Sequence, residues 1–120
     1  MNKNIKDRRS RRKKRVSSKI SGSKDKPRIS VFASKLYTYA QAIDDIARET
    51  LTEYSSLKMA RDKDYKKDKK VSEAKKVGIE LARKIKKIGV KQAVFDRGRY
   101  SYNGRVKAVA DGLREEGIQI

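Results

Sequence analysis

The stretch RISVFASKLYTYAQAID, Arg28 to Asp44, alternates with a period of two along most of its length. Such alternation is typical of β-strands with one buried face, because successive side chains of a strand point to opposite sides. It predicts a first strand over Arg28–Ser34 and a second over Tyr37–Asp44. Little more than Lys35 and Leu36 is left to join them, which predicts a tight β-hairpin.

The two faces of this hairpin differ in chemistry. One face is predicted to carry small and aliphatic side chains: Ile29, Val31, Ala33, Thr38, Ala40 and Ala42. The other is predicted to carry Ser30, Phe32, Ser34, Tyr37, Tyr39, Gln41 and Ile43. Exposed aromatic rings can stack on unpaired bases, while hydroxyls and amides reach base edges or 2′-hydroxyls. The alternative, weighed most seriously for Phe32, is a second core layer covered by a helix.

The rest of the chain continues the fold. TLTEYSS, residues 50–56, predicts a third strand, and the charged residues 57–70 are interpreted as a solvated loop with at most a loose helical turn. From about Ser72 the apolar period becomes 3.6, which predicts an amphipathic helix that ends at Gly89. Its apolar stripe is Ala74, Val77, Gly78, Leu81, Ile85 and Ile88.

The C-terminal third completes the predicted order. VKQAVF, residues 90–95, predicts a short buried strand. A second amphipathic helix is predicted to end near Gly117, with its apolar face formed by Val106, Val109, Ala110 and Leu113. The order β-β-β-α-β-α predicts an α/β fold with a mixed sheet and helices on at least one face.

The composition limits the classes of function and of partner that the chain can have. The chain has 120 residues, which indicates one domain plus at most a tail, and its 34 basic and 15 acidic residues give a net charge of +19. Such a charge favours a polyanionic partner, with nucleic acid more fitting than an anionic membrane surface. There is no cysteine and no histidine, which excludes disulfides, thiolate metal sites and a histidine general base. No cofactor is predicted, and no apolar run is long enough to span a membrane.

The positive charge is concentrated at the N-terminus. Residues 1–28 hold 13 basic and two acidic residues, whereas residues 29–120 hold 21 and 13. The first segment has little to bury, which predicts a basic arm over residues 1–27, disordered when free, followed by a globular RNA-binding domain over residues 28–120. Seven basic residues of the arm can neutralise phosphates: Arg8, Arg9, Arg11, Arg12, Lys13, Lys14 and Arg15. A solubilising or targeting tail is the alternative.

A second basic segment, FDRGRYSYNGRVKAVADG, spans residues 95–112. It contains neither the P-loop pattern nor GxGxxG, so it is not a nucleotide fingerprint. Asn103 is a candidate N-cap, and free N–H groups at a helix start favour an anion. Four cations surround this point: Arg97, Arg99, Arg105 and Lys107. The segment therefore predicts contact with a backbone phosphate of a nucleic acid.

Catalysis is the competing class of function. Asp44, Asp45 and Asp96 could hold magnesium for phosphodiester cleavage. However, the first strand carries no acid, and Asp44 and Asp45 are also explained by a turn. We therefore predict that the protein is not an enzyme. A histone-like or membrane-surface polycation is a further alternative, although a simple polycation needs no such pattern of strands and helices.

Two long stretches resemble a known family. They are KISGSKDKPRISVFASKLYTYAQAIDD, residues 19–45, and VFDRGRYSYNGRVKAVADGLREEG, residues 94–117. Both resemble signature stretches of the bacterial large-subunit ribosomal protein eighteen, a family that binds 5S rRNA. The helix VSEAKKVGIELARKIKKIGV, residues 71–90, has the matching place between them, and the resemblance covers residues 8–120.

The resemblance implies a ribonuclease H-like fold without catalytic acids and a place in the large subunit of cytoplasmic ribosomes. The protein would attach 5S rRNA to the large-subunit rRNA in the central protuberance, beside other 5S-associated ribosomal proteins. No membrane and no homo-oligomer are expected, because RNA can supply the compensating surface.

Carried over by position, the resemblance also implies which residues contact RNA. They are the arm from Arg8 to Lys19, Ser21, Gly22, Arg28, Ser30, Phe32, Ser34, Tyr37, Tyr39, Gln41, Arg97, Tyr100, Tyr102, Arg105 and Lys107. The chain departs from the family at Arg99, where glycine is frequent, and at Asn103, where histidine is frequent. Residues 57–70 lie outside the signature, and no contact is assigned to them.

Overall fold

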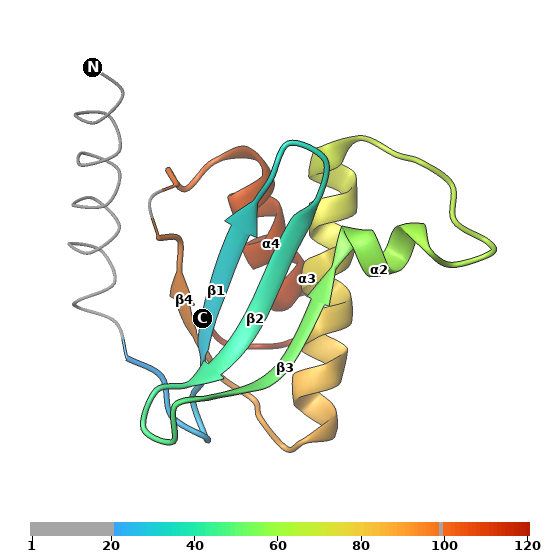
Figure 1. The fold of residues 1–120 in the computed structure, drawn as a ribbon. Helices are drawn as coiled ribbons and strands as arrows, with labels where there is room; N and C mark the ends of the chain where they lie inside the picture. The colour runs from blue at the N-terminus through green and yellow to red at the C-terminus, as the bar shows by residue number, and fades with distance from the viewer. Residues whose placement is uncertain (1–20, 99) are drawn as a thin grey trace.

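The computed structural model describes residues 21–98 and 100–120, so the predicted arm up to residue 20 and Arg99 lie outside the described residues. The strands are β1 (Arg28–Ala33), β2 (Thr38–Asp44), β3 (Glu49–Ser55) and β4 (Val94–Asp96). The helices are α2 (Ser56–Ala60), α3 (Lys70–Lys87) and α4 (Gly104–Glu115) (Figure 1).

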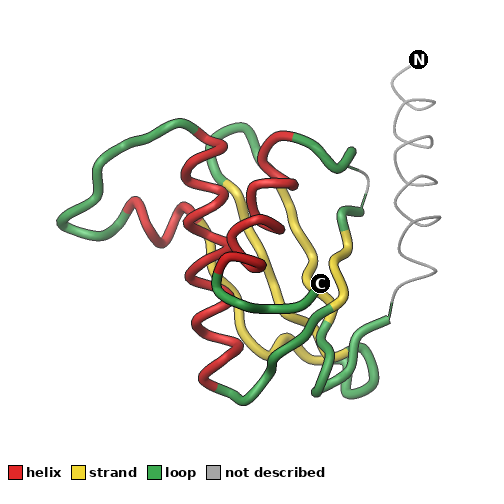
Figure 2. The backbone as a smooth tube through the Cα atoms, turned by 180° about the vertical axis from the view of Figure 1, so that it is seen from behind, coloured by secondary structure: helices red, strands yellow, loops and turns green. Residues whose placement is uncertain are grey.

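The strands form one four-stranded sheet in the order β3-β2-β1-β4. β2 pairs antiparallel with both β1 and β3, whereas β4 pairs parallel with β1. Both long helices, α3 and α4, lie on the same side of the sheet (Figure 1). Figure 2 shows the same arrangement from behind. The predicted α/β class, the mixed sheet and the cover of one face by helices are confirmed.

The hairpin forms as predicted but has a longer turn. Ser30 lies opposite Gln41, and Phe32 lies opposite Tyr39. Four residues join the strands instead of two, because the backbone of Ser34 and Tyr37 closes the turn with an N–H···O bond of 2.9 Å. The Ser34 hydroxyl reinforces it with two bonds of 3.0 Å to the Tyr37 backbone, so Tyr37 belongs to the turn and not to β2.

The core lies between the helices and the predicted aliphatic face. Ile29, Val31, Ala40 and Ala42 are buried there. The helix residues that pack against them include Val77, Leu81, Ile85, Val109 and Leu113. Ile88 was predicted in this stripe, but its side chain is 53% exposed because it follows the last helical residue and leaves the helical period.

The charged segment 57–70 is more ordered than a plain loop. The structure has the predicted helical turn as α2, where the Ser55 hydroxyl caps the helix by accepting from the Lys58 N–H at 3.3 Å. α3 begins at Lys70, two residues before the predicted start. At its C-terminal end Gly89 has a φ of +85°, the left-handed conformation that commonly terminates a helix.

α3 and α4 approach each other closely at two glycines. A Cβ atom on Gly78 would lie 2.2 Å from the Val109 carbonyl oxygen, and one on Gly112 would lie 2.3 Å from the Lys75 carbonyl oxygen. Both neighbours are backbone atoms, which cannot move aside as a flexible side chain can. The glycines are therefore required by the distance between the helices.

The Gly78→Ala variant tests this packing through the sign of its effect. In an open helix, replacement of glycine by alanine stabilises by about 1 kcal/mol. Here the added methyl group forces the helices apart, so the free energy of unfolding should fall by about 2 kcal/mol in urea denaturation. An unchanged or raised free energy of unfolding would show that the two helices can separate without cost.

Candidate nucleic-acid interface

The face of the sheet opposite the helices is open and aromatic. A shallow depression of about 380 Å³ lies on it, lined by Ser30, Phe32, Ser34, Tyr39 and Gln41. The ring centroids of Phe32 and Tyr39 lie 5.9 Å apart at an interplanar angle of 43°. The Phe32 side chain is 52% exposed, so the alternative that it forms a second core layer is wrong.

The chemistry of this open sheet face suits an unpaired base. The aromatic rings offer planes for stacking, and the hydroxyls of Ser30 and Ser34 flank them. The Gln41 amide makes a long 3.5 Å contact with the Glu53 carboxylate, which leaves most of its hydrogen-bonding capacity for a ligand. Tyr37, predicted on the same face, is half-buried in the turn beyond the depression.

The loop after β4 is attached to the end of the hairpin. The Tyr100 hydroxyl accepts from the Ala33 N–H at 3.1 Å and donates to the Ala33 carbonyl at 3.3 Å. Arg97 in turn donates from Nη1 to the Tyr100 carbonyl at 2.7 Å. Tyr100 therefore positions the loop beside the open sheet face, and its hydroxyl is engaged with backbone.

The start of α4 meets the hairpin turn. Asn103 is the N-cap, as predicted, and its side-chain oxygen accepts from the Gly104 N–H at 2.8 Å. Arg105 donates from Nη1 to the Ser34 carbonyl at 2.8 Å, which ties the first turn of α4 to the turn of the hairpin. Lys107, two residues later in the same first turn, is exposed. The structure thus brings the basic helix start together with one end of the open sheet face.

Tyr102 adds an exposed ring with an unexpected partner. Its side chain is 42% exposed and meets Phe95 edge to face, with 6.0 Å between the ring centroids. Arg114 of α4 lies 5.9 Å from the Tyr102 ring centroid and donates to its hydroxyl at 2.6 Å. Arg114 was not among the predicted contact residues, because its contact with Tyr102 joins residues 12 positions apart in the sequence.

Arg28 is the centre of an ion-pair network. Its Nε lies 2.9 Å from Asp45 Oδ2, and its Nη1 lies 2.8 Å from Asp96 Oδ2. Asp45 also accepts from the Gly22 N–H at 2.6 Å, and a Cβ on the buried Gly22 would lie 2.2 Å from the Arg28 nitrogen. Arg28 and Gly22, both predicted to contact RNA, thus hold the chain entry to the sheet, whereas Ser21 is exposed.

The network also bears on the magnesium alternative. The Arg28 guanidinium bridges the Asp45 and Asp96 carboxylates, so a protein cation stands where that alternative would place a metal. Asp44 instead accepts from the Ile46 and Ala47 N–H groups and forms the predicted turn. Across residues 21–98 and 100–120, no three acidic, histidine or cysteine side chains cluster as metal ligands.

The hydrogen bond from Arg28 lowers the pKa of Asp45 below 3.8. A carboxylate whose pKa is lower in the folded than in the unfolded protein stabilises the fold above the unfolded pKa, and this contribution is lost as the pH falls through the folded pKa. We expect Asp45→Asn to flatten the decline of the free energy of unfolding between about pH 5 and pH 3. Urea denaturation across this range measures it, and an equally steep decline in the variant would contradict the pairing.

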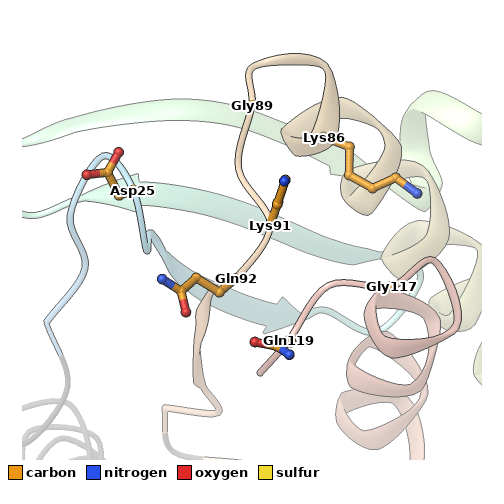
Figure 3. A pocket seen from close by; sticks show the side chains of 7 residues that line it. All are labelled: Asp25, Lys86, Gly89, Lys91, Gln92, Gly117 and Gln119. Carbon is orange, nitrogen blue, oxygen red and sulfur yellow. The ribbon is translucent and has the colours of Figure 1, made fainter.

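A second, more polar cavity of about 570 Å³ lies at the C-terminal ends of α3 and α4 (Figure 3). Its lining residues are Asp25, Lys86, Gly89, Lys91, Gln92, Gly117 and Gln119. The charges are of both signs, no aromatic plane is present, and Lys86 donates to the Glu116 carbonyl at 2.7 Å. This cavity lacks the features that make the open sheet face a candidate for base stacking.

Comparison with known proteins agrees with the resemblance of the two signature stretches. The sequence pattern of a family described as ribosomal L18 of archaea, bacteria, mitochondria and chloroplasts matches residues 3–120. The chain belongs to the ribosomal L18 family. Relatives named large ribosomal subunit protein uL18 include those of Syntrophus aciditrophicus and Thermotoga petrophila. The first is 46% identical, with 92% of each chain covered, and the second is 43% identical, with 95% of this chain and 93% of the relative covered.

Membership of the ribosomal L18 family agrees with the prediction that the chain is not an enzyme, because these relatives are named as ribosomal proteins. Within the part of the chain that the structure describes, no helix combines the length and apolar character needed to cross a membrane. The predicted contact residues up to Lys19, and Arg99, lie outside the described residues.

Proposed function

We propose that this ribosomal L18 chain is a structural protein of the large ribosomal subunit that binds 5S rRNA and helps to attach it to the large-subunit rRNA. The observation that carries the proposal is the open sheet face, on which a half-exposed phenylalanine and a tyrosine are surrounded by hydroxyl and amide groups. In a chain of net charge +19, such a face suits RNA better than any neutral ligand.

The proposal divides the work between two parts of the chain. Residues 1–20 supply arginines and lysines that neutralise phosphates. Residues 21–27, predicted as part of a disordered arm, are instead attached to the sheet, with Gly22 and Pro27 buried. Residues 28–120 form the domain, whose open sheet face stacks on unpaired bases while Arg105 and Lys107 contact phosphate nearby. The central protuberance, with its other 5S-associated proteins, is the expected surrounding.

We also propose the ribonuclease H-like fold that the resemblance implies. Two observations are compatible with it: the strand order β3-β2-β1-β4, and a parallel bridge between Gln92 and Gln119. The sheet lacks the acid that a ribonuclease would carry on its first strand, since β1 reads RISVFA. The fold would thus serve here as a binding platform.

The Phe32→Ala variant tests base stacking on the open sheet face. Stacking of one base on an aromatic side chain contributes about 1–3 kcal/mol, so the affinity for 5S rRNA should fall by about tenfold or more. The Ile88→Ala variant is the matched control, because Ile88 is equally exposed but follows α3 outside this face. In a filter-binding titration the control should stay within about twofold of the unaltered protein. Equal affinities for the two variants would show that Phe32 contacts no base.

A further inference from the structure

A second basic surface begins at the hairpin turn and extends away from the open sheet face along the loop between α2 and α3. It consists of Lys35 in the hairpin turn, of Lys66, Lys67 and Lys69 at the end of the loop between α2 and α3, and of Lys70 at the start of α3, and we call it the loop lysine patch. All five side chains are exposed, and Lys70 donates from Nζ to the Lys35 carbonyl, which joins the two parts. In Figure 1 this loop projects beyond β3 and α3, on the side of the domain opposite β4.

The loop that carries these lysines is held by a buried carboxylate. Glu73, on the first turn of α3, is only 6% exposed. It accepts from the Tyr65 hydroxyl at 2.5 Å and from the Asp68 N–H at 3.2 Å. A solvated loop has no need of such an anchor. Because the anchor already orders the loop, less conformational entropy is lost when the loop binds a partner.

The charge of the loop lysine patch is not compensated inside the protein. Within the described residues, none of its five ammonium groups forms an ion pair with a carboxylate, and the nearby Asp68 pairs with Lys76 at 3.6 Å. Three exposed cations farther along α3 are instead paired internally: Lys75 with Glu115, Arg83 with Glu80, and Lys86 with Glu116. Internal acids therefore pair with much of the positive charge of α3, whereas the lysines of the patch form no such pair within the described residues and can bind an external anion.

The chemistry of the patch favours an RNA backbone over a protein. Protein interfaces are depleted in lysine and rely on buried aromatic or arginine anchors, whereas this patch has five lysines with only two exposed aliphatic side chains, Leu36 and Val71, beside them in the described residues. The Tyr65 hydroxyl is engaged by Glu73 and therefore does not contact a base edge. Lysine ammonium groups act as point charges that suit phosphates.

We propose that the loop lysine patch is a second RNA-binding surface, which contacts the phosphate backbone of an RNA helix separate from the RNA on the open sheet face. This proposal rests on the proposed function, which joins 5S rRNA to the large-subunit rRNA, and it names the surface of the domain that contacts the second RNA. It recognises the shape and charge of a duplex and carries no sequence preference.

The experiment uses the full-length protein saturated with 5S rRNA and an added labelled RNA duplex of about 20 base pairs. The variant K66Q/K67Q/K69Q removes three charges from the patch, and K75Q/K86Q/K87Q removes three charges from α3 as the matched control. We expect the complex to bind the duplex. The patch variant should weaken this binding at least tenfold and lower the slope of log K against log salt by about 2.7, since each phosphate contact contributes about 0.9.

The affinity of the patch variant for 5S rRNA should stay within about twofold. If both triple variants weakened duplex binding equally, net charge alone would be responsible and the proposal would be overturned. The proposal would also be overturned if the unaltered complex bound no duplex and the patch variant lost affinity for 5S rRNA. That result would place the patch in the first RNA site. Failure of the proposed function would give a different result. The unaltered protein would then bind 5S rRNA no better than another RNA of equal length, whether or not it bound the duplex.

The Tyr65→Phe variant tests the anchor without a change of charge. Loss of the hydrogen bond to Glu73 should loosen the loop and weaken duplex binding about threefold, with the salt slope unchanged. Undiminished duplex binding by Tyr65→Phe would contradict the role of the anchored loop conformation.

Discussion

Neutralisation of the basic cluster between Arg8 and Arg15 is expected to reduce the affinity for 5S rRNA by about a thousandfold at moderate salt. The change replaces seven residues by glutamine: Arg8, Arg9, Arg11, Arg12, Lys13, Lys14 and Arg15. Each phosphate contact releases counterions and contributes about 0.9 to the slope of log K against log salt, so the slope should fall by about 6 if all seven make contact. Titrations at several salt concentrations measure both quantities.

Two controls separate the arm from the domain. Replacement of the five arginines of the cluster by lysine keeps the charge, so the salt slope should be preserved while the bidentate contacts are lost. Deletion of residues 1–20 should leave a cooperative thermal transition, because the core is built from residues 29–118. An unchanged salt slope after neutralisation would show that the arm does not contact phosphate.

Replacement of Arg28 by methionine is expected to lower the free energy of unfolding by about 3 kcal/mol. Arg28 pairs with Asp45 and with Asp96, whose side chain is only 2% exposed. Removal of the guanidinium leaves two carboxylates close together and takes from the buried Asp96 its ion pair with Arg28, and loss of an ion-pair partner in a buried position is costly. Urea denaturation at neutral pH measures the loss.

The matched control is Arg83→Met. Arg83 also forms ion pairs, with Glu80 and Glu116, but its side chain is 55% exposed, and exposed pairs contribute about 0–1 kcal/mol. The additional Asp96→Asn change should recover part of the stability lost in Arg28→Met, because it removes the buried charge. A loss for Arg28→Met no larger than that for Arg83→Met would mean that the network contributes little to the fold.

Local patterns predicted most of the elements. The period-two alternation of the hairpin assigned Ile29 and Ala40 to one face and Phe32 to the other, because that alternation follows directly from strand geometry, but it could not show that the face with Phe32 is open. The helix end at Gly89 and the N-cap at Asn103 were equally predictable, since both depend on the conformational preferences of single residues. The prediction that Ile88 belongs to the apolar stripe was wrong, because the helical period does not show where the helix ends.

The contacts that shape the candidate interface could not be predicted in the same way. Arg28 meets an acid 68 positions away, and the Tyr100 hydroxyl meets a backbone group 67 positions away. No periodicity encodes such pairs, because they depend on the parallel placement of β4 beside β1. The sequence therefore indicated which residues belong to the interface region, and the structure separates those whose polar groups are engaged from those that stand open.

Specific recognition of 5S rRNA is the central claim, and a competition titration tests it most directly. The full-length protein is titrated with labelled 5S rRNA in the presence of either unlabelled 5S rRNA or a shuffled RNA of the same length and composition, at one fixed salt concentration. We predict that 5S rRNA competes about a hundredfold better or more, because base stacking on the open sheet face adds to the phosphate contacts that any RNA provides. Equal competition by the two RNAs would contradict the claim and leave a general polycation.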